Sequence, residues 1–249
     1  WRFAAPVPDD TAALPLSVAA VERIAGAPLD MLRSFDGFGL LAGAGIPCAA
    51  VAEITAPAQI GAFAAEHGWP LVLKIDDAAI AHKSDQGGVF IGLRDEEEAL
   101  VAWNALRQRH PAAPVIVQAM ETGTEIILGM TTDPDFGPLI TLGLGGVFAE
   151  ILRDTTTLLP PYSPATARRA LESLQAFPLL TGARARPPAD LDALCALISR
   201  FSAFAAGAAD HLREIEINPV LAGPKGAVAV DCIALRQTPK QKEAARHGQ

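Results

Sequence analysis

A lysine, a histidine and a glycine pair follow one short apolar segment. Lys74 ends the run Leu71–Leu73, His82 lies in the polar turn beyond it, and Gly87 and Gly88 close that turn. A buried ammonium group needs a negative partner, and glycine lets backbone N–H groups approach an anion closely. The pattern therefore predicts a phosphate-binding site formed by Lys74 and the glycine pair.

His82 has two interpretations. A lone histidine most often has a structural or surface role, and we interpret the other four histidines in that way. His82 differs because it lies between Lys74 and the glycine pair, where a neutral imidazole is placed to attack a phosphoryl group. The spacing alone leaves both interpretations open.

A second glycine-rich segment, Gly143-Leu-Gly-Gly146, is also ambiguous, because glycines in turns often serve only the backbone conformation and bind no ligand. Neither glycine segment fits the dinucleotide fingerprint, which needs G-x-G-x-x-G between a strand and a helix. Neither has the Walker spacing that ends in Lys-Ser or Lys-Thr. The nucleotide folds defined by those two motifs are therefore disfavoured.

Oxygen-bearing side chains alternate near the C-terminus. Glu214, Glu216 and Asn218 share one face of an expected strand, because successive side chains of a strand point to opposite faces. Asp231 reaches the same face if the next strand pairs antiparallel. Carboxylate and amide oxygens beside a phosphate are the ligands that Mg²⁺ takes, although a solvated polar strand face has the same pattern.

Composition limits the classes of protein to consider. The 249 residues carry a formal net charge of −8, which argues against a nucleic-acid partner. Apolar runs are interrupted well before the ~18–20 residues of a membrane span. Cys48, Cys195 and Cys232 lack metal-ligand spacing, which indicates reduced thiols and a cytoplasmic location. Because the first residue is Trp1, we expect a fragment of a longer chain.

Hydrophobic periodicity predicts an α+β fold. Asp95 and Glu98 are placed to cap one of the helices, and Asp133–Pro138 has the composition of a hairpin turn. The segment 227–233 is expected to pair with 214–221 as the closing strand. The expected helices cover 30–41, the region of 60–68, 95–106, 163–174 and 189–206, and the expected strands cover 49–54, 71–75, 88–93, 114–120, 124–132, 138–142, 156–159, 214–221 and 227–233.

Several motifs together resemble a known family. They are Leu71-Val-Leu-Lys74, Ile80-Ala-His-Lys-Ser-Asp-Gln-Gly-Gly-Val89, Val117-Gln-Ala-Met120, Gly123-Thr-Glu125, Asp133-Pro-Asp-Phe-Gly-Pro138, Gly143-Leu-Gly-Gly-Val-Phe-Ala-Glu150 and Glu216-Ile-Asn-Pro219. In this order they resemble the ATP-grasp part of ADP-forming acyl-CoA synthetases, the acetate-CoA ligase family, which is related to the succinyl-CoA synthetase β subunit. Gln86 and Ala119 depart from the residues frequent in the family, but neither is a proposed phosphate or metal ligand.

The resemblance implies an ATP-grasp fold with two α+β lobes and a nucleotide cleft between them. Residues 28–236 would form this domain, with a small lobe at about 49–117 and a larger lobe from 28–48 plus 118–236. Residues 1–27 would be a remnant of an upstream region, and 237–249 a polar tail. The resemblance assigns Lys74, Gly87, Gly88, Gln118, Ala119, Met120, Glu125, Gly145 and Gly146 to the nucleotide, His82 to phosphoryl relay, and Asn218, Asp231 and Glu216 to Mg²⁺.

The implied activity joins a carboxylic acid to CoA while ATP becomes ADP and phosphate, through an acyl phosphate and a phosphohistidine. ATP or ADP and Mg²⁺ would bind this chain. CoA would bind upstream CoA-binding and succinyl-CoA-ligase-like domains or an α subunit, in an oligomeric enzyme. The alternative is a nucleotide-sensing, non-catalytic module of a fusion such as a protein acetyltransferase. An ATP-grasp ligase of unrelated substrate class is disfavoured by the His-Lys-Ser-Asp string.

Overall fold

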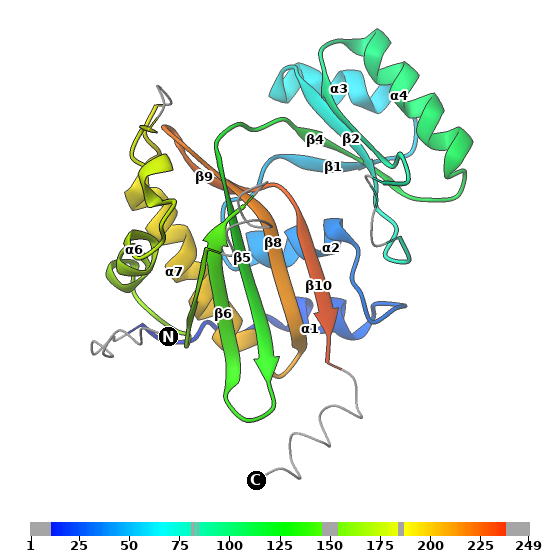
Figure 1. Ribbon diagram of the computed structural model, residues 1–249. Coiled ribbons are helices and arrows are strands. Elements are labelled where there is room, and N and C mark those ends of the chain that lie inside the picture. The colour runs from blue at the N-terminus through cyan, green and yellow to red at the C-terminus, as the bar shows by residue number, and fades with distance from the viewer. Residues whose placement is uncertain (1–10, 81–82, 84, 146–153, 184–186, 238–249) are drawn as a thin grey trace.

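Two β-sheets, each covered by helices, form the described part of the protein (Figure 1). The computed structural model describes residues 11–80, 83, 85–145, 154–183 and 187–237. Two separate hydrophobic cores accompany the two sheets. The α+β fold expected from the sequence is therefore confirmed, and we call the two units the small lobe and the large lobe.

The small lobe is a four-stranded antiparallel sheet with the strand order β1-β4-β2-β3. Its buried face packs against two helices through Phe63, Trp103 and the apolar residues of β2 and β4. The second helix is capped as expected, since the Asp95 carboxylate accepts from Glu98 N and Glu98 accepts from Arg94 N. The elements are β1 (Val51–Ile54), α3 (Ala58–His67), β2 (Leu71–Ile75), β3 (Val89–Leu93), α4 (Glu96–Arg109) and β4 (Val115–Ala119).

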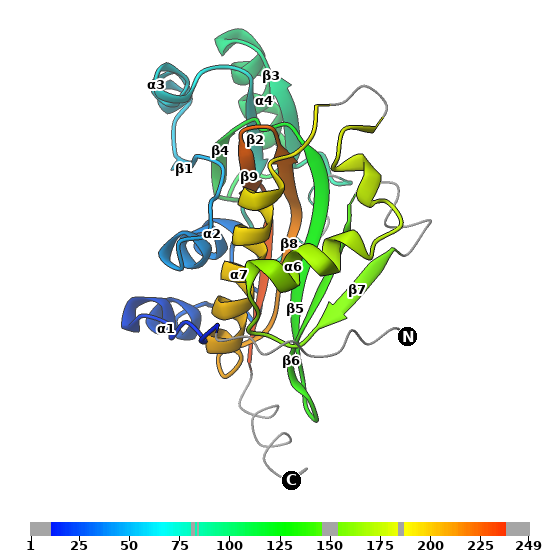
Figure 2. The same ribbon diagram turned by 90° about the vertical axis from the view of Figure 1, so that its left-hand side faces the viewer.

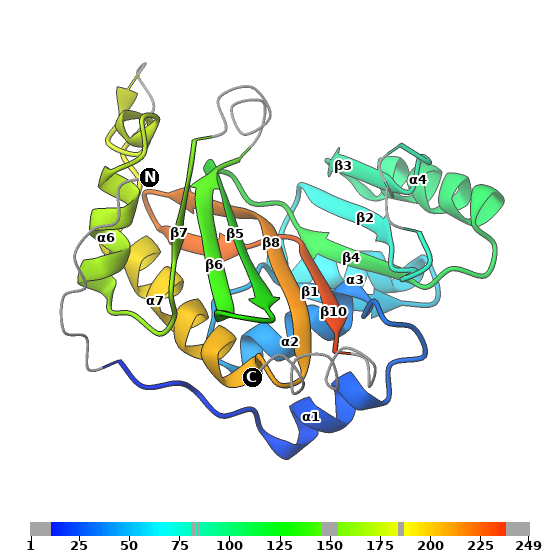
Figure 3. The same ribbon diagram turned by 60° about the horizontal axis from the view of Figure 1, so that its bottom comes forward.

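The large lobe is built on a sheet of order β10-β8-β5-β6-β7, and β9 also pairs with β8. Its described helices lie along one side of the sheet (Figure 3), and no helix of the described residues lies over the opposite face, which we call the open face. The strands are β5 (Thr124–Asp133), β6 (Gly137–Leu144), β7 (Thr155–Leu158), β8 (Leu212–Gly223), β9 (Gly226–Ala229) and β10 (Cys232–Arg236); the helices are α1 (Val18–Ala25), α2 (Ser34–Gly43), α6 (Pro164–Glu172), the 3-10 turn η1 (Phe177–Leu179) and α7 (Leu191–Ala208).

The helix α7 supplies much of the large core. Figure 2 shows it over the sheet together with α6, and its Phe201 and Phe204 rings are almost fully buried, with centroids 6.3 Å apart. By length and composition α7 could cross a membrane, but 61% of its apolar window is buried inside the protein. Its hydrophobicity is therefore accounted for by the core of the large lobe.

The closing strand differs from the expectation. The sequence pattern predicts one strand over 227–233, whereas the structure has β9 and β10 with a break at Val230 and Asp231. The break lies opposite Asn218 and Pro219 of β8, where the pairing of β8 with β5 also shifts by one residue, between the Ile126–Val220 and Leu128–Ile217 pairs. This bulge contains Pro219, which has no N–H for a ladder, and the Pro219 carbonyl instead accepts from Val230 N.

The start of α2 also differs, at Ser34 instead of Asp30. Its first amides are satisfied by a residue of the small lobe, because the fully buried Asp76 carboxylate accepts from Ser34 N at 2.7 Å and from Phe35 N at 3.0 Å. A carboxylate at a helix N-terminus satisfies orphan donors and is stabilised by the helix dipole. Asp76 therefore fixes both the helix start and the contact between the two lobes.

We predict that Asp76→Ala lowers the free energy of unfolding by about 1–3 kcal/mol, because buried N–H groups of α2 lose their acceptor. Urea unfolding followed by circular dichroism measures the change. Asp135→Ala, at an exposed position of the β5–β6 turn, is the matched control and should have little effect. Equal stability of the two variants would contradict the capping role.

Candidate nucleotide site

Lys74 is the central charged group of the site. Its neighbours Leu73 and Ile75 belong to the small-lobe core under α3 and α4, so the alternation of the strand turns Lys74 toward the large lobe. Only 4% of the residue is exposed. Its Nζ donates to Val230 O at 3.1 Å and to Asp231 Oδ1 at 3.3 Å, and lies 5.5 Å from the centre of the Phe38 ring. The lysine that the sequence predicts to bind phosphate thus contacts the aspartate that it predicts to bind a metal.

The expected metal ligands gather on the open face of the large sheet. Ile217 pairs with Cys232, which places Asn218 and Asp231 at adjoining positions of neighbouring strands. Asn218 Nδ2 donates to Glu216 Oε1 at 3.0 Å, so these two side chains also share that face. Within the described residues, no group of three or more His, Cys, Asp or Glu side chains is arranged to hold a metal. The predicted set of Asn218, Glu216 and Asp231 offers amide and carboxylate oxygens, and its binding of Mg²⁺ stays a prediction.

A cavity of about 200 Å³ opens between the lobes beside Asp231. Its polar lining comes from both lobes and has one ammonium, three carboxylates and one hydroxyl, while apolar side chains such as Met31 and Ile233 form the remainder. The cavity is lined by Met31, Leu32, Ser34, Asp77, Ala78, Ile80, Lys83, Asp85, Val89, Asp231, Cys232 and Ile233.

The sequence analysis missed a second interlobe cluster at this cavity. Lys83 Nζ donates to Ser34 Oγ at 2.8 Å and lies 3.5 Å from Asp76 Oδ1. Lys83 belongs to the His-Lys-Ser-Asp string, so that motif was a signal for its position. Nothing in the local pattern indicated Ser34 or Asp76, because their contact joins residues 42 apart in the chain.

Three residues that the resemblance assigns to the nucleotide, Gln118, Ala119 and Met120, lie at the end of β4. Ala119 N donates to Ala50 O at 2.9 Å, and Met120 N donates to Pro70 O at 3.3 Å. The backbone donors of these two residues are therefore already engaged. Gln118 is only 3% exposed, and its Nε2 has no hydrogen-bond partner among the described residues.

The glycine pair has a clear backbone role. Gly87 adopts a positive φ of 62°, and a Cβ on Gly88 would lie 2.7 Å from Ile75 Cδ1 and 2.9 Å from Lys83 O. Gly88 N already donates to Lys83 O at 2.7 Å. Contact of either glycine with phosphate stays a prediction.

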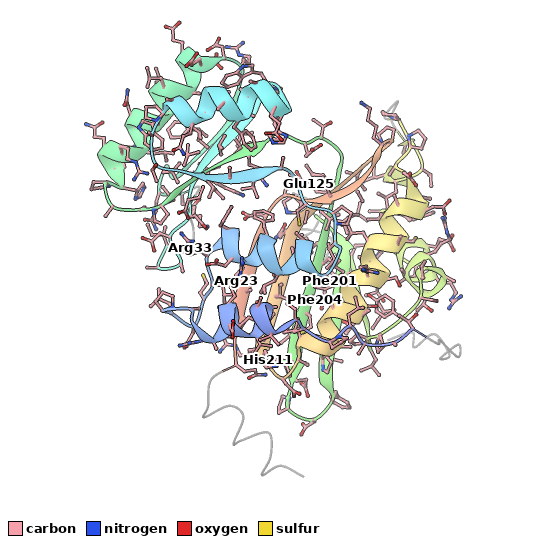
Figure 4. All side chains as sticks on the ribbon, turned by 180° about the vertical axis from the view of Figure 1, so that it is seen from behind. Arg23, Arg33, Glu125, Phe201, Phe204 and His211 are labelled. Carbon is pink, nitrogen blue, oxygen red and sulfur yellow. The ribbon has the colours of Figure 1, made fainter. Side chains whose placement is uncertain are left out.

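Glu125 and Gly145 lie against each other on neighbouring strands. Gly145 N donates to Glu125 O at 2.7 Å, and a Cβ on Gly145 would come within 2.9 Å of Glu125 Cβ. Figure 4 places Glu125 where the chain passes from the small lobe to the large lobe. Their predicted contact with the nucleotide is compatible with this position. The predicted residues His82 and Gly146 lie outside the described residues.

The three cysteines are poor nucleophiles. Burial raises the pKa of the Cys48 thiol to about 11 and also raises the pKa values of Cys195 and Cys232. All three are free thiols. Because the thiolate is the reactive form, none of them is suited to covalent catalysis near neutral pH.

Comparisons with known proteins agree with this architecture. The family model of the ATP-grasp domain matches residues 25–234. The β subunit of acetate–CoA ligase (ADP-forming) I from Pyrococcus furiosus is 37% identical over 177 residues, which cover 68% of this chain and 76% of the relative. Trans-feruloyl-CoA synthase from an unidentified prokaryote is 36% identical over 194 residues, which cover 74% of this chain but only 27% of that longer protein.

A solved structure of acetyl-coenzyme A synthetase 1 from Ca. Korarchaeum cryptofilum superposes with a TM-score of 0.73. It is 32% identical, and the match covers 84% of this chain and 93% of that one. That protein was solved with coenzyme A and Mg-AMPPCP, with its phosphohistidine segment pointing towards the nucleotide-binding site.

Two lobes with an interlobe site of lysine and oxygen ligands define an ATP-grasp domain. More narrowly, the chain belongs to the ADP-forming acetate–CoA ligase (acyl-CoA synthetase) family and corresponds to the ATP-grasp part of its β subunit.

We predict slow alkylation of the native chain by iodoacetamide at about pH 7.5, accelerating as the pH rises toward the raised thiol pKa values. Mass spectrometry of the modified peptides measures the rate at each cysteine. The urea-unfolded chain, whose thiols have ordinary pKa values, is the control and should react much faster. Rapid labelling of Cys48 in the folded chain would contradict the prediction.

Proposed function

We propose that this chain binds Mg-ATP or Mg-ADP between its lobes and supplies the nucleotide half of an ADP-forming acyl-CoA synthetase. The observation that carries the proposal is the contact of Lys74 with Val230 O and Asp231 across the cleft. A buried ammonium whose hydrogen-bond acceptors belong to the opposite lobe is suited to bind a polyphosphate. The small lobe at 49–117 and the large lobe at 28–48 plus 118–236 are the proposed domain division.

The proposed reaction converts a carboxylic acid, CoA and ATP into acyl-CoA, ADP and phosphate, and it is reversible. Lys74 would bind phosphate oxygens and neutralise charge on the transferring phosphoryl group. Asn218, Asp231 and Glu216 would hold Mg²⁺, which when bound neutralises further phosphate charge. Positioning and electrostatics would therefore dominate this chain's contribution to catalysis.

His82 is the proposed phosphoryl acceptor of this chain. A phosphohistidine carried on the partner subunit or domain would exchange its phosphoryl group with the nucleotide by way of His82. CoA and the acid would bind that partner, and the longer relatives, of which this chain spans about a quarter, have room for it. Free thiols are compatible with a reducing compartment, so we place the enzyme in the cytoplasm.

A second candidate is a nucleotide-sensing module without catalytic activity. The contacts of Lys74 with Val230 O and Asp231 are consistent with nucleotide binding alone as well as with turnover. Retention of His82 favours catalysis, because a sensor needs no phosphoryl acceptor. The two candidates share the nucleotide site and differ in what His82 does.

We predict that Lys74→Met weakens Mg-ATP binding at least tenfold, because the phosphate loses its buried cation. Isothermal titration calorimetry on the chain measures the affinity. Lys225→Met, at an exposed position of the β8–β9 turn, is the matched control and should bind like the parent protein. Indistinguishable titrations of Lys74→Met and the parent would rule out the phosphate role.

We predict that His82→Ala, in the enzyme assembled with its CoA-binding partner, abolishes acid-dependent acyl-CoA formation while Mg-ATP affinity stays within about twofold. A thioester assay and calorimetry report the two quantities. Unchanged turnover would refute the relay and leave the nucleotide-sensing role as the better account.

A further inference from the structure

A second cavity lies away from the cleft, among the helices of the large lobe. It has a volume of about 300 Å³ and is walled by residues 14–17 and by α1, α2 and α7. It shares no lining residue with the interlobe cavity. Figure 4, the view from behind, labels Arg23 of α1 and Phe204 of α7, which both line it. The phosphate and metal chemistry of the cleft therefore does not account for this cavity.

The charged side chains that line this cavity are both basic. They are Arg23 and Arg200, and no Asp or Glu of the described residues lines it. The third polar side chain, Ser17, is already engaged, because its Oγ accepts from Ala20 N at the start of α1. Two guanidinium groups thus face one cavity in a chain whose net charge is −8. The cavity is therefore suited to an anion.

Arg200 keeps most of its donors for a ligand. Its Nε donates to Ala44 O at 2.7 Å, which fixes the guanidinium at the C-terminal end of α2. Within the described part of the chain, Arg200 makes no ion pair and no other hydrogen bond. A guanidinium has five N–H groups, and its planar fork binds a carboxylate with two parallel hydrogen bonds.

Arg23 has only a long contact with its nearest carboxylate. Its Nη1 lies 3.9 Å from Asp36 Oδ1, whereas Arg33 Nε lies 3.3 Å from the other oxygen of the same carboxylate. Arg23 also lies across Gly39 of α2, where a Cβ would clash with Nη1. The missing side chain of Gly39 therefore leaves room for the guanidinium at the cavity wall, where it can exchange the Asp36 contact for a ligand carboxylate.

The two arginines are separated along α2. Arg23 lies across Gly39, whereas Arg200 bonds at the C-cap residue Ala44. From Gly39 to Ala44 the helix axis rises about 7–8 Å. A single carboxylate, with hydrogen bonds of about 2.7–2.9 Å, bonds well to one arginine at a time at this separation. The wall also includes Phe204 of the large core, so a ligand that satisfies both arginines has two anionic ends and a short hydrocarbon middle.

We propose that the cavity binds a short aliphatic dicarboxylate, of about the size of glutarate, with one carboxylate on Arg23 and the other on Arg200. The methylene chain lies against Phe204 and the apolar residues of segment 14–17. The inference goes beyond the proposed function, because it concerns a cavity that shares no lining residue with the interlobe site.

The test is isothermal titration calorimetry of succinate, glutarate, adipate and butyrate into the parent chain without nucleotide. At least one diacid should bind tenfold or more tightly than butyrate, which has one carboxylate and leaves one arginine unbound. Arg23→Met and Arg200→Met should each weaken that diacid at least tenfold. Arg94→Met, which removes an exposed arginine of the small lobe, is the matched control and should bind the diacid like the parent.

Variants of Gly43 separate binding in the cavity from the role of Arg200 at the end of α2. Gly43 lines the cavity, and a Cβ there would meet nothing within 4 Å. Gly43→Leu places a side chain at this wall and should abolish diacid binding. Its melting temperature should not fall, because leucine forms helix better than glycine. Gly43→Ala adds a single methyl group, is the matched control and should bind the diacid nearly like the parent.

The contrary outcomes are equally clear. Absence of diacid binding to the parent chain, or equal affinity for butyrate and the diacids, would overturn the proposal. A folded Gly43→Leu chain that binds the diacid like the parent would do the same. Lys74→Met should leave diacid binding unchanged; if it abolishes that binding, the diacid binds in the cleft, so that the cavity assignment fails while the proposed nucleotide site stands.

Discussion

The buried ammonium of Lys74 is the constraint on which the cleft depends. A charge removed from water must find oxygen partners, and among the described residues those of the Lys74 ammonium come from the other lobe. The partners are Val230 O and Asp231 of the large lobe, 156 and 157 residues further along the chain. These contacts therefore join the two lobes across the cleft.

A second interlobe contact has the opposite polarity. Asp76, one residue beyond β2, is a fully buried carboxylate whose oxygens accept from the first amides of α2, with Lys83 close by. The small lobe thus places the Lys74 ammonium at the break between β9 and β10, and the Asp76 carboxylate at the N-terminus of α2. Opening the cleft would separate both pairs, so the two contacts oppose motion until a ligand replaces one of them.

Local sequence signals were sufficient for most of the fold. Alternation along Leu71–Ile75 and the Asp95–Glu98 cap each specify an element without help from distant residues, and both are found in the structure. The pattern failed where the deciding contact was remote. Asp76 sets the start of α2, and the bulge at Asn218–Pro219 divides what the pattern shows as one strand.

In the candidate site, too, local signals were predictable from the sequence and remote contacts were not. Lys74 is recognisable in its strand because an ammonium in an apolar run is unusual, but no spacing rule links it with Asp231. The motif resemblance supplied that association, and the structure supplied the contact. Ser34, which bonds to Lys83, carries no signal in its own neighbourhood.

The pairing of β1 with β4 has a consequence for the order in which the protein is made. Because Val51 lies beside Gln118, the chain enters and leaves the small lobe at neighbouring positions, and that sheet is complete once residue 119 has left the ribosome. The large sheet must wait for β8, which lies between β5 and β10 and begins at Leu212. Until then one edge of β5 is open, and an unpaired strand edge is a template for aggregation. The nascent chain is most exposed to misassembly during synthesis of the segment that includes α6 and α7, when chaperones would have most to protect.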